Sequence, residues 1–447
     1  MQLGNIFIIL GPEKATDMAL RKALWLFCLL IIAQGSKSQL LMDMIDTTSE
    51  VGKNVLGNRY NRFFISGYLQ PQFQVVQSKG ARSFGGGDFP ANSNNRFTLR
   101  RGRLRLDYQH LNKNNEVSLH FVFQFDGTER GFFTRDFWGR FFENKWRLFS
   151  FTTGIFARPF GYELNLGSSD RESPERGRMS QILMKVERDI GGMISFEPRK
   201  PDAKLRNLKI DAGFFNGQGV NATTDYDSYK DFIARASWKS SPVTKDLFVS
   251  GGLSYFNGGL FQNSKYSYTI EDAAAGKLFR VDSSAAHFGR KAPRRYYGAD
   301  IQWKWKHGHG NTELRGEYWW GTQTASGHTS ETPPELLQEP YYIRKFNGAF
   351  IYLLHNIINK QHQVGVKYDW YDPNSEIAGD DIGKTDSRTG IADIKFSTLS
   401  IGYNYHINAN LKLMLWYDII RNESTALTDY TGDIKDDLFT ARLQYRF

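Results

Sequence analysis

The last nine residues, FTARLQYRF (439–447), place apolar and polar side chains in strict alternation. The five odd-numbered residues from Phe439 to Phe447 are apolar, and the four residues between them are polar. A period of two is that of a β-strand with one face in apolar surroundings and the other in water. A half-buried strand of a soluble protein would alternate in the same way, so this segment alone leaves the class of protein open.

The same alternation recurs along most of the chain in runs of about ten residues, the length with which a tilted strand crosses a bilayer. We count sixteen such runs, an even number, as in bacterial membrane barrels. The strands are predicted at 60–76, 95–109, 115–127, 132–142, 146–158, 189–197, 207–216, 230–239, 246–257, 295–306, 310–321, 341–354, 361–371, 393–406, 409–422 and 435–447.

The connections between the predicted strands alternate in length. Even-numbered connections such as 110–114 and 407–408 are short, and odd-numbered ones such as 159–188 and 258–294 are long, with 128–131 as the exception. Bacterial barrels have short periplasmic turns and longer outer loops, whereas the turns of a soluble sandwich have no reason to follow strand parity. The sequence therefore predicts an all-β fold, a transmembrane antiparallel β-barrel of about 16 strands with a constriction loop in the pore.

The composition agrees with a barrel that encloses water. The 447 residues have a mean hydropathy of -0.49, which excludes a bundle of membrane helices, because each such helix needs roughly 20 consecutive apolar residues. At 15 % aromatic residues the chain is also too rich in large side chains for a disordered protein. The net charge of +10 favours anionic partners, either small solutes or the phosphates of lipopolysaccharide. No nucleic-acid partner is expected.

The N-terminal region has the layout of a secretory signal. The basic pair Arg21-Lys22 precedes an apolar run at 23–33, and the small residues Ser36 and Ser38 precede a possible cleavage before Gln39. We expect Met18 to be the true start of the precursor. The predicted division is 1–17 as a non-native upstream extension, 18–38 as the signal peptide, 39–59 as a short N-terminal segment and 60–447 as the barrel.

One polar strand face is unusually basic. In RRGRLRLDY (100–108), the side chains of Arg101, Arg103 and Arg105 point the same way, roughly 7 Å apart at two residues per repeat. If the leucines between them face lipid, these three guanidinium groups face the pore. Arginine stays charged and offers planar donors to phosphate or carboxylate, so the row could pass an anion from site to site.

These arginines have an alternative role, in which they pair with acidic groups of a pore loop, or with Asp107 and Glu116, and only shape the lumen. The loop in question is the connection 159–188, which could set the diameter and field of the constriction or could instead be a solvated outer loop. Its basic residues and those at its ends are Arg158, Arg171, Arg176, Arg178, Lys185 and Arg188, and its acidic residues are Asp170, Glu172, Glu175 and Glu187.

Four segments resemble a known family. GIFARPFG (154–161), the later ESP (172–174) and RDIG (188–191), together with YNYHINANLKL (403–413), are similar to the phosphate-selective porin O and P family. The resemblance implies a sixteen-stranded, trimeric barrel of the bacterial outer membrane with an anion-favouring pore. The arginine row, by contrast, rests on strand parity and not on the resemblance.

No local motif pairs a histidine with an activated nucleophile, so no catalysis is expected, and neither a cofactor nor a metal site. The function predicted from the sequence is passive diffusion through an outer-membrane porin, favouring anions such as phosphate. Expected partners are outer-membrane lipids and lipopolysaccharide, small anionic solutes and two further copies of the chain. An alternative is a barrel with a closed pore that acts in surface interaction or adhesion, and a barrel enzyme is the third possibility.

Overall fold

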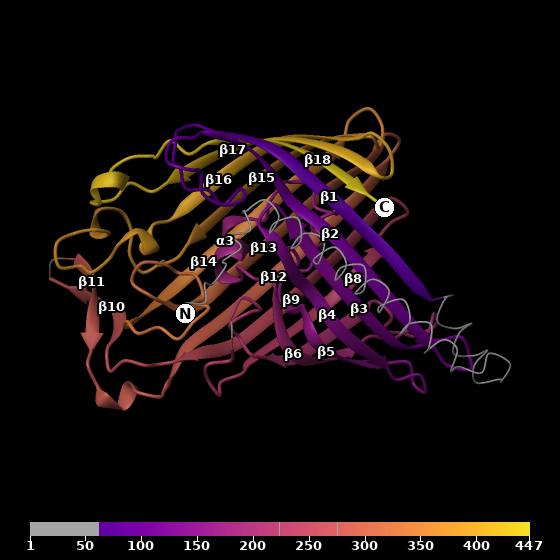
Figure 1. Cartoon of the computed structure of the whole chain (residues 1–447), viewed down its shortest axis with the longest axis horizontal. Helices are drawn as coiled ribbons and strands as arrows, with labels where there is room; N and C mark the ends of the chain where they lie inside the picture. Colours follow the sequence, from indigo (N-terminus) through magenta and orange to yellow (C-terminus); the bar gives the residue numbers. More distant parts are fainter. Residues whose placement is uncertain (1–61, 223, 275) are drawn as a thin grey trace, which may run out of the picture. The chain divides into compact units, whose positions relative to one another are not determined.

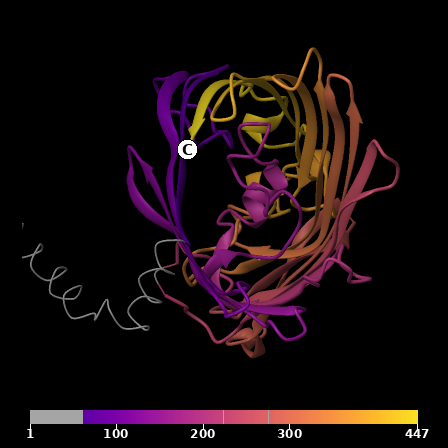
Figure 2. The same ribbon diagram turned by 90° about the vertical axis from the view of Figure 1, so that its right-hand side faces the viewer.

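The computed structural model describes residues 62–447 except 223 and 275, and these residues contain a closed antiparallel β-barrel (Figure 1, Figure 2). Sixteen strands form the wall, and β1 closes it by pairing with both β2 and β18. The wall strands are β1 (Phe63–Val76), β2 (Asn95–Leu111), β3 (Val117–Thr128), β4 (Gly131–Phe142), β5 (Phe149–Ala157), β6 (Arg188–Phe196), β7 (Leu208–Phe215), β8 (Asp231–Pro242), β9 (Leu247–Phe261), β12 (Lys291–His307), β13 (Gly310–Ala325), β14 (Tyr341–Asn356), β15 (His362–Asp372), β16 (Phe396–His406), β17 (Leu411–Asn422) and β18 (Leu438–Arg446). The predicted fold class is confirmed.

The prediction of a long connection at 258–294 is wrong in part. Strand β9 continues to Phe261 and β12 begins at Lys291, and between them a hairpin of β10 (Ser267–Ala273) and β11 (Gly276–Asp282) extends beyond the wall (Figure 1). Strands that continue past the bilayer no longer need an apolar outward face, so the alternation on which the prediction rested disappears there.

The segments predicted at 1–17, 18–38 and 39–59 lie outside the described residues and stay predictions. Within the described part of the chain, no helix combines the length and the apolar character needed to cross a membrane.

The wall carries apolar side chains outside and largely polar side chains inside, as the alternation predicts, except where apolar side chains of the wall meet the chain that fills the lumen. On β16, Leu399 and Ile401 are exposed on the outer face, whereas Ser400 and Asn404 are buried on the inner face. The inner side chains are buried because one connection between strands fills a large part of the lumen. It is the third odd-numbered connection, residues 158–187, which we call the constriction loop.

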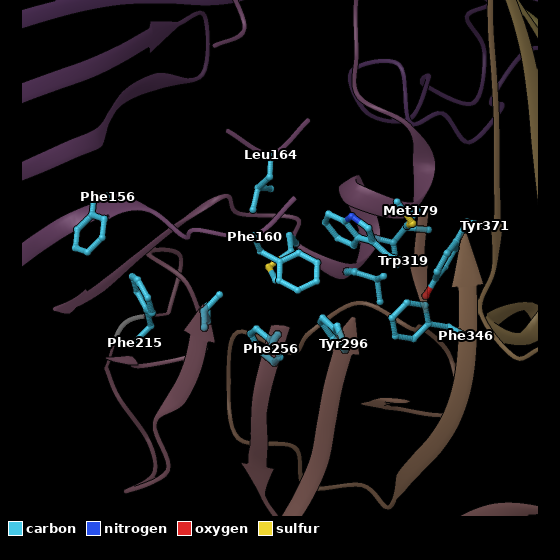
Figure 3. Close-up of a cluster of buried hydrophobic side chains, with 14 of the residues drawn as sticks. Phe156, Phe160, Leu164, Met179, Phe215, Phe256, Tyr296, Trp319, Phe346 and Tyr371 are labelled. Carbon is cyan, nitrogen blue, oxygen red and sulfur yellow. The ribbon is translucent and has the colours of Figure 1, made fainter. Parts of the chain in front are cut away.

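The constriction loop folds into the barrel and contains the short helix α3 (Arg178–Leu183) (Figure 1, Figure 2). Its apolar side chains meet those of β9 and β12 to β15 in one buried cluster (Figure 3). At the centre of this cluster the Phe160 ring, which is fully buried, stands edge-on to Trp319 with 4.7 Å between ring centroids. The loop is therefore a constriction loop, and the alternative of a solvated outer loop is wrong.

Polar contacts anchor the beginning of the constriction loop to the wall. The carboxylate of Glu317 on β13 accepts hydrogen bonds from the backbone N–H groups of Tyr162 (2.9 Å) and Glu163 (2.8 Å) and from the Trp319 indole (2.6 Å). The chain can approach this carboxylate so closely because Gly161, at φ +64°, has no side chain. Further along, the backbone N–H of Arg178 is bonded to Asp369 on β15 at 3.1 Å.

Candidate functional site: the pore constriction

Two β-bulges turn additional arginines into the lumen. Between β1 and β2, Leu69 faces Gly102 but Pro71 faces Leu99, so Arg100 and Arg101 together oppose a single residue. A bulge of this kind lets two consecutive side chains point to the same side of a sheet. The basic row of β2 therefore has four members, Arg100 in addition to the predicted Arg101, Arg103 and Arg105.

The second bulge lies on β4, where Arg135 is the unpaired residue between Thr134 and Asp136. Strict alternation overlooked both Arg100 and Arg135. The one available signal was a pair of adjacent charged residues within each strand, which a regular strand cannot direct to the same face.

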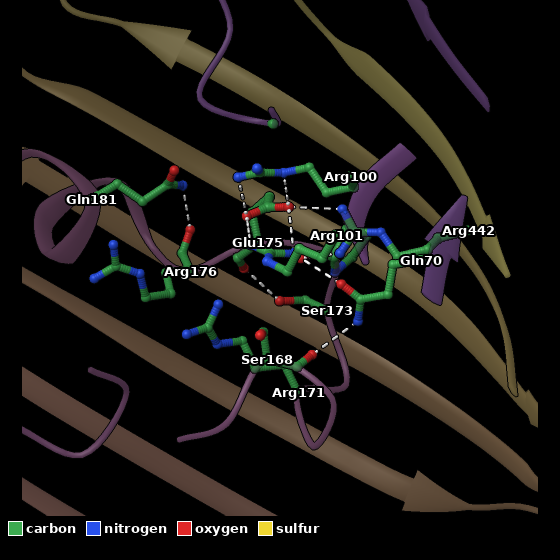
Figure 4. A network of polar contacts seen from close by, with 12 residues as sticks. Gln70, Arg100, Arg101, Ser168, Arg171, Ser173, Glu175, Arg176, Gln181 and Arg442 are labelled. Carbon is green, nitrogen blue, oxygen red and sulfur yellow. Dashed lines mark hydrogen bonds and ion pairs between the residues drawn. The ribbon is translucent and has the colours of Figure 1, made fainter. Parts of the chain in front are cut away.

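The first cluster of the site surrounds the Glu175 carboxylate (Figure 4). Glu175 Oε1 accepts from Arg100 Nε (2.8 Å), Arg101 Nη1 (3.3 Å) and Arg442 Nη2 (2.7 Å), and Oε2 accepts from Arg100 Nη2 (3.1 Å) and Arg101 Nη2 (2.8 Å). Burial alone would raise the pKa of this carboxyl, but the three arginines hold its pKa well below the usual range. Glu175 is thus a carboxylate that ties the constriction loop to β2 and β18.

The second cluster surrounds Glu187, at the end of the constriction loop. Its carboxylate lies 2.7 Å from Arg135, 3.3 Å from Arg188, 3.5 Å from Arg176 and 3.8 Å from Arg171. Burial opposes ionisation here as well, but these four cations hold the pKa of Glu187 well below its usual range. The extra arginine of each bulge therefore meets one buried glutamate of the constriction loop.

The remaining members of the predicted row also have carboxylate partners. Arg103 pairs with Asp126 at 3.0 Å, and Arg105 pairs with Asp107 at 2.7 Å. Of the partners named for the alternative role, Glu175 of the constriction loop pairs with Arg101 and Asp107 pairs with Arg105. Arg103 has a partner on β3 that was not predicted, and Glu116 pairs with Arg147 instead.

The other basic residues of the constriction loop have different surroundings. Arg178 lies between the rings of Phe84 and Phe396, with its guanidinium carbon 4.5 and 4.0 Å from their centroids. Arg158 is buried at the base of the loop, where it donates to the Val186 carbonyl. Lys185 is exposed and pairs with an acidic residue of another outer connection.

A cavity of about 910 Å³ opens on the outer side of the constriction, and we call it the outer cavity. Nine Arg and Lys side chains line it against six Asp and Glu, an excess of three positive charges. The basic residues are Arg82, Arg100, Arg101, Arg103, Arg130, Arg135, Arg176, Arg178 and Lys185, and the acidic ones are Asp88, Asp126, Glu175, Glu187, Glu331 and Asp436. Among the described residues, no three His, Cys, Asp or Glu side chains are grouped so as to hold a metal ion.

Solved structures with the same fold are outer-membrane proteins. The outer membrane channel DcaP of Acinetobacter baumannii is 11 % identical, with a TM-score of 0.52 over 86 % of this chain and 97 % of that chain. Pseudomonas putida OprB is 9 % identical, also with a TM-score of 0.52, over 90 % of this chain and 97 % of that chain. No model of a protein family and no curated protein matches the sequence. At this identity the likeness shows the fold alone, and the closed barrel with its apolar outer face belongs in the outer membrane.

Proposed function

We propose that this protein is an outer-membrane porin, a passive diffusion channel that favours anions. The observation that carries the proposal is the outer cavity, whose positive excess lies directly outside a constriction flanked by arginines. A cleft lined by one sign of charge between low-dielectric walls concentrates ions of the opposite sign. Anions would therefore be enriched where the pore is narrowest.

The anion path in this proposal follows the arginine row of β2, from Arg100 and Arg101 past Arg103 to Arg105. Each of these guanidinium groups has a carboxylate partner, yet a guanidinium offers five N–H donors, of which a single carboxylate uses about two. Arg101 and Arg103 use one further group on Gln70 and Ser168, and the donors that are then left are available to a passing anion. Partial neutralisation also keeps each site weak enough to release its ion, as conduction requires.

Phosphate is a candidate solute within this class. The resemblance of GIFARPFG (154–161) and YNYHINANLKL (403–413) to the phosphate-selective porin O and P family supports it, as does the affinity of arginine for phosphate oxygens. Arg171, Arg176 and Arg188, held around Glu187, would set the width and field of the constriction.

Homotrimer formation is the second part of the proposal, and it draws on an asymmetry of the outer wall. Strands β3 to β7 direct many Phe and Ile side chains outward, but no Trp or Tyr: Phe123, Phe125, Phe132, Phe137, Phe141, Phe149, Phe151, Ile190, Ile194, Ile210 and Phe214. Strands β12 to β17 instead carry exposed Trp and Tyr, among them Trp303, Trp305, Tyr318, Trp320, Tyr368 and Tyr417. Such rings prefer the boundary between lipid and water.

We therefore assign β12 to β17 to lipid and lipopolysaccharide, and the Phe-rich face to neighbouring copies. Replacement of Phe123 and Phe137, whose rings lie 4.4 Å apart, by Ala should weaken the oligomer in native electrophoresis. Each substitution removes roughly 1.5–3 kcal/mol of apolar burial if that face is covered by protein. The matched pair Leu399→Ala and Ile401→Ala lies on the lipid face and should leave the oligomer unchanged. Equal effects of the two pairs would contradict the assignment.

Reversal potentials of the purified mature protein in a planar bilayer under a KCl gradient test the channel function. We expect a reversal potential on the anion side, and current that falls as phosphate is added. Joint replacement of Arg101, Arg103 and Arg105 by Ala should reduce the anion preference of a folded barrel, and unchanged selectivity would remove the row from the path. Absence of conductance would favour the alternative of a surface-interaction protein.

A further inference from the structure

The Glu175 cluster has the geometry of a carboxylate-binding site. Arg100 and Arg101 each present two N–H donors to the two oxygens of the same carboxylate, and Arg442 adds a fifth donor from β18. Paired N–H donors of this kind match the planar two-oxygen edge of a carboxylate. The wall thus supplies three positive charges to one negative group.

The wall holds two of these arginines in place independently of Glu175. Arg101 donates to Gln70 at 3.1 Å, and Arg442 donates to Gln72 at 3.0 Å, and both glutamines lie on β1. Arg442 is 1 % exposed, so its charge cannot turn away into water. The site would therefore keep its shape if the carboxylate of Glu175 moved out.

The site is also reachable from the outer cavity. Arg100, Arg101 and Glu175 all line that cavity, and the Arg100 side chain is 30 % exposed. Among the described residues, Arg100 has no side-chain hydrogen bond except those to Glu175. An anion in the outer cavity can therefore contact Arg100 first and then share the donors of Arg101 and Arg442.

We propose that Arg100, Arg101 and Arg442 form a binding subsite for small carboxylates passing through the pore, and that Glu175 is a tethered ligand which the passing carboxylate displaces. This inference rests on the proposed porin function and adds small carboxylates, with a binding site for them, to the anions that the pore would pass. The exchange replaces one carboxylate by another, so the three arginines are never left without a counter-charge, which would be costly at this burial.

Tethering explains why such a site would not trap its solute. A group held beside its binding site by a short chain acts as a competitor at an effective concentration in the millimolar range or above. Glu175 would return as soon as the solute loosens, which keeps the apparent affinity low and the release fast. Low affinity at successive sites is the condition for conduction.

The test uses the mature protein with Glu175→Ala in a planar bilayer, with potassium acetate titrated into KCl on the side of the outer cavity. Acetate should reduce the current of this variant at a concentration about tenfold or more below that needed for the unchanged protein, the factor expected when one charge-assisted hydrogen bond no longer has to be displaced. Glu175→Gln, which keeps the side-chain volume, should also lower the acetate concentration needed for block. It replaces the alanine variant in the test if that variant fails to fold.

The matched control is Asp170→Ala on the same constriction loop. Asp170 also pairs with an arginine of β18, Arg446, at 3.2 Å, but this pair is exposed and lies outside the lining of the outer cavity. Its removal changes the net charge equally, so its acetate concentration for half-block should match that of the unchanged protein. The proposal would be overturned if the acetate concentration for half-block changed equally in the Glu175 and Asp170 variants, or if it changed in neither Glu175 variant.

Phosphate titrated in parallel separates a carboxylate site from a general oxyanion site. Stronger block of the Glu175 variants by acetate than by phosphate supports the proposal, and the reverse order overturns the solute class. The reversal potential of the unchanged protein is an independent readout. Cation preference there would refute the porin proposal, whereas the acetate shift between variants reports on the site alone.

Discussion

Replacement of Gly161 by Ala should release the beginning of the constriction loop from the wall. Gly161 has φ +64°, and a Cβ added there would lie 2.0 Å from Glu317 Oε1 and 2.7 Å from a ring atom of Trp319. The left-handed backbone costs an alanine about 1–2 kcal/mol. Moving the Glu317 carboxylate away from the N–H groups of Tyr162 and Glu163 costs a further 1.5–3 kcal/mol or so for each buried bond that is lost.

With one bond lost, the sum is about 2.5–5 kcal/mol, which corresponds to a factor of about 10² or more in the equilibrium between docked and released loop. Backbone amide hydrogen exchange, followed by mass spectrometry on peptides covering 158–187, measures this equilibrium directly. We expect exchange in those peptides to be roughly a hundredfold faster in the variant, with the strands of the wall unaffected. Single-channel currents should become noisier, because the released loop no longer holds one position in the lumen.

Gly379 supplies the control for backbone strain. It has φ +60°, like Gly161, but an added Cβ there would meet no atom within 4 Å. Gly379→Ala therefore carries the strain without the collision and should leave exchange in 158–187 unchanged. If the amide hydrogens of the constriction loop exchange no faster in the Gly161→Ala variant than in the Gly379→Ala variant, the contact with Glu317 does not hold that loop.

Two further predictions concern the outer connections. Asp393→Asn leaves Arg344, its fully buried partner at 2.8 Å, without a counter-charge, so the connection 373–395 should be destabilised by about 3–5 kcal/mol and exchange its amides faster; unchanged exchange would contradict this. Burial raises the pKa of Asp436 on the outer cavity to about 6, against the attraction of Arg178. Because the carboxyl is neutral below that pKa, acidification from roughly pH 7.5 to 5 should increase anion preference, and Asp436→Asn should show less of this increase.

The sequence by itself determined the class of fold and the strand order. Strands that cross a bilayer must alternate, because their outward residues meet lipid and their inward residues meet water or protein. This requirement acts on each strand locally, so it can be read from one segment at a time, as in FTARLQYRF (439–447). The same reasoning placed Arg101, Arg103 and Arg105 on one face and singled out the connection 159–188.

Only the tertiary structure decided what those arginines contact. The bulges that add Arg100 and Arg135 arise from the register between neighbouring strands, which alternation within one strand cannot report. The ion pair of Glu175 with Arg442 joins residues 267 positions apart and exists because the constriction loop folds back onto β18, the last strand. Burial of Phe160 against Trp319 holds that loop, and such packing depends on the closed wall and not on any local pattern.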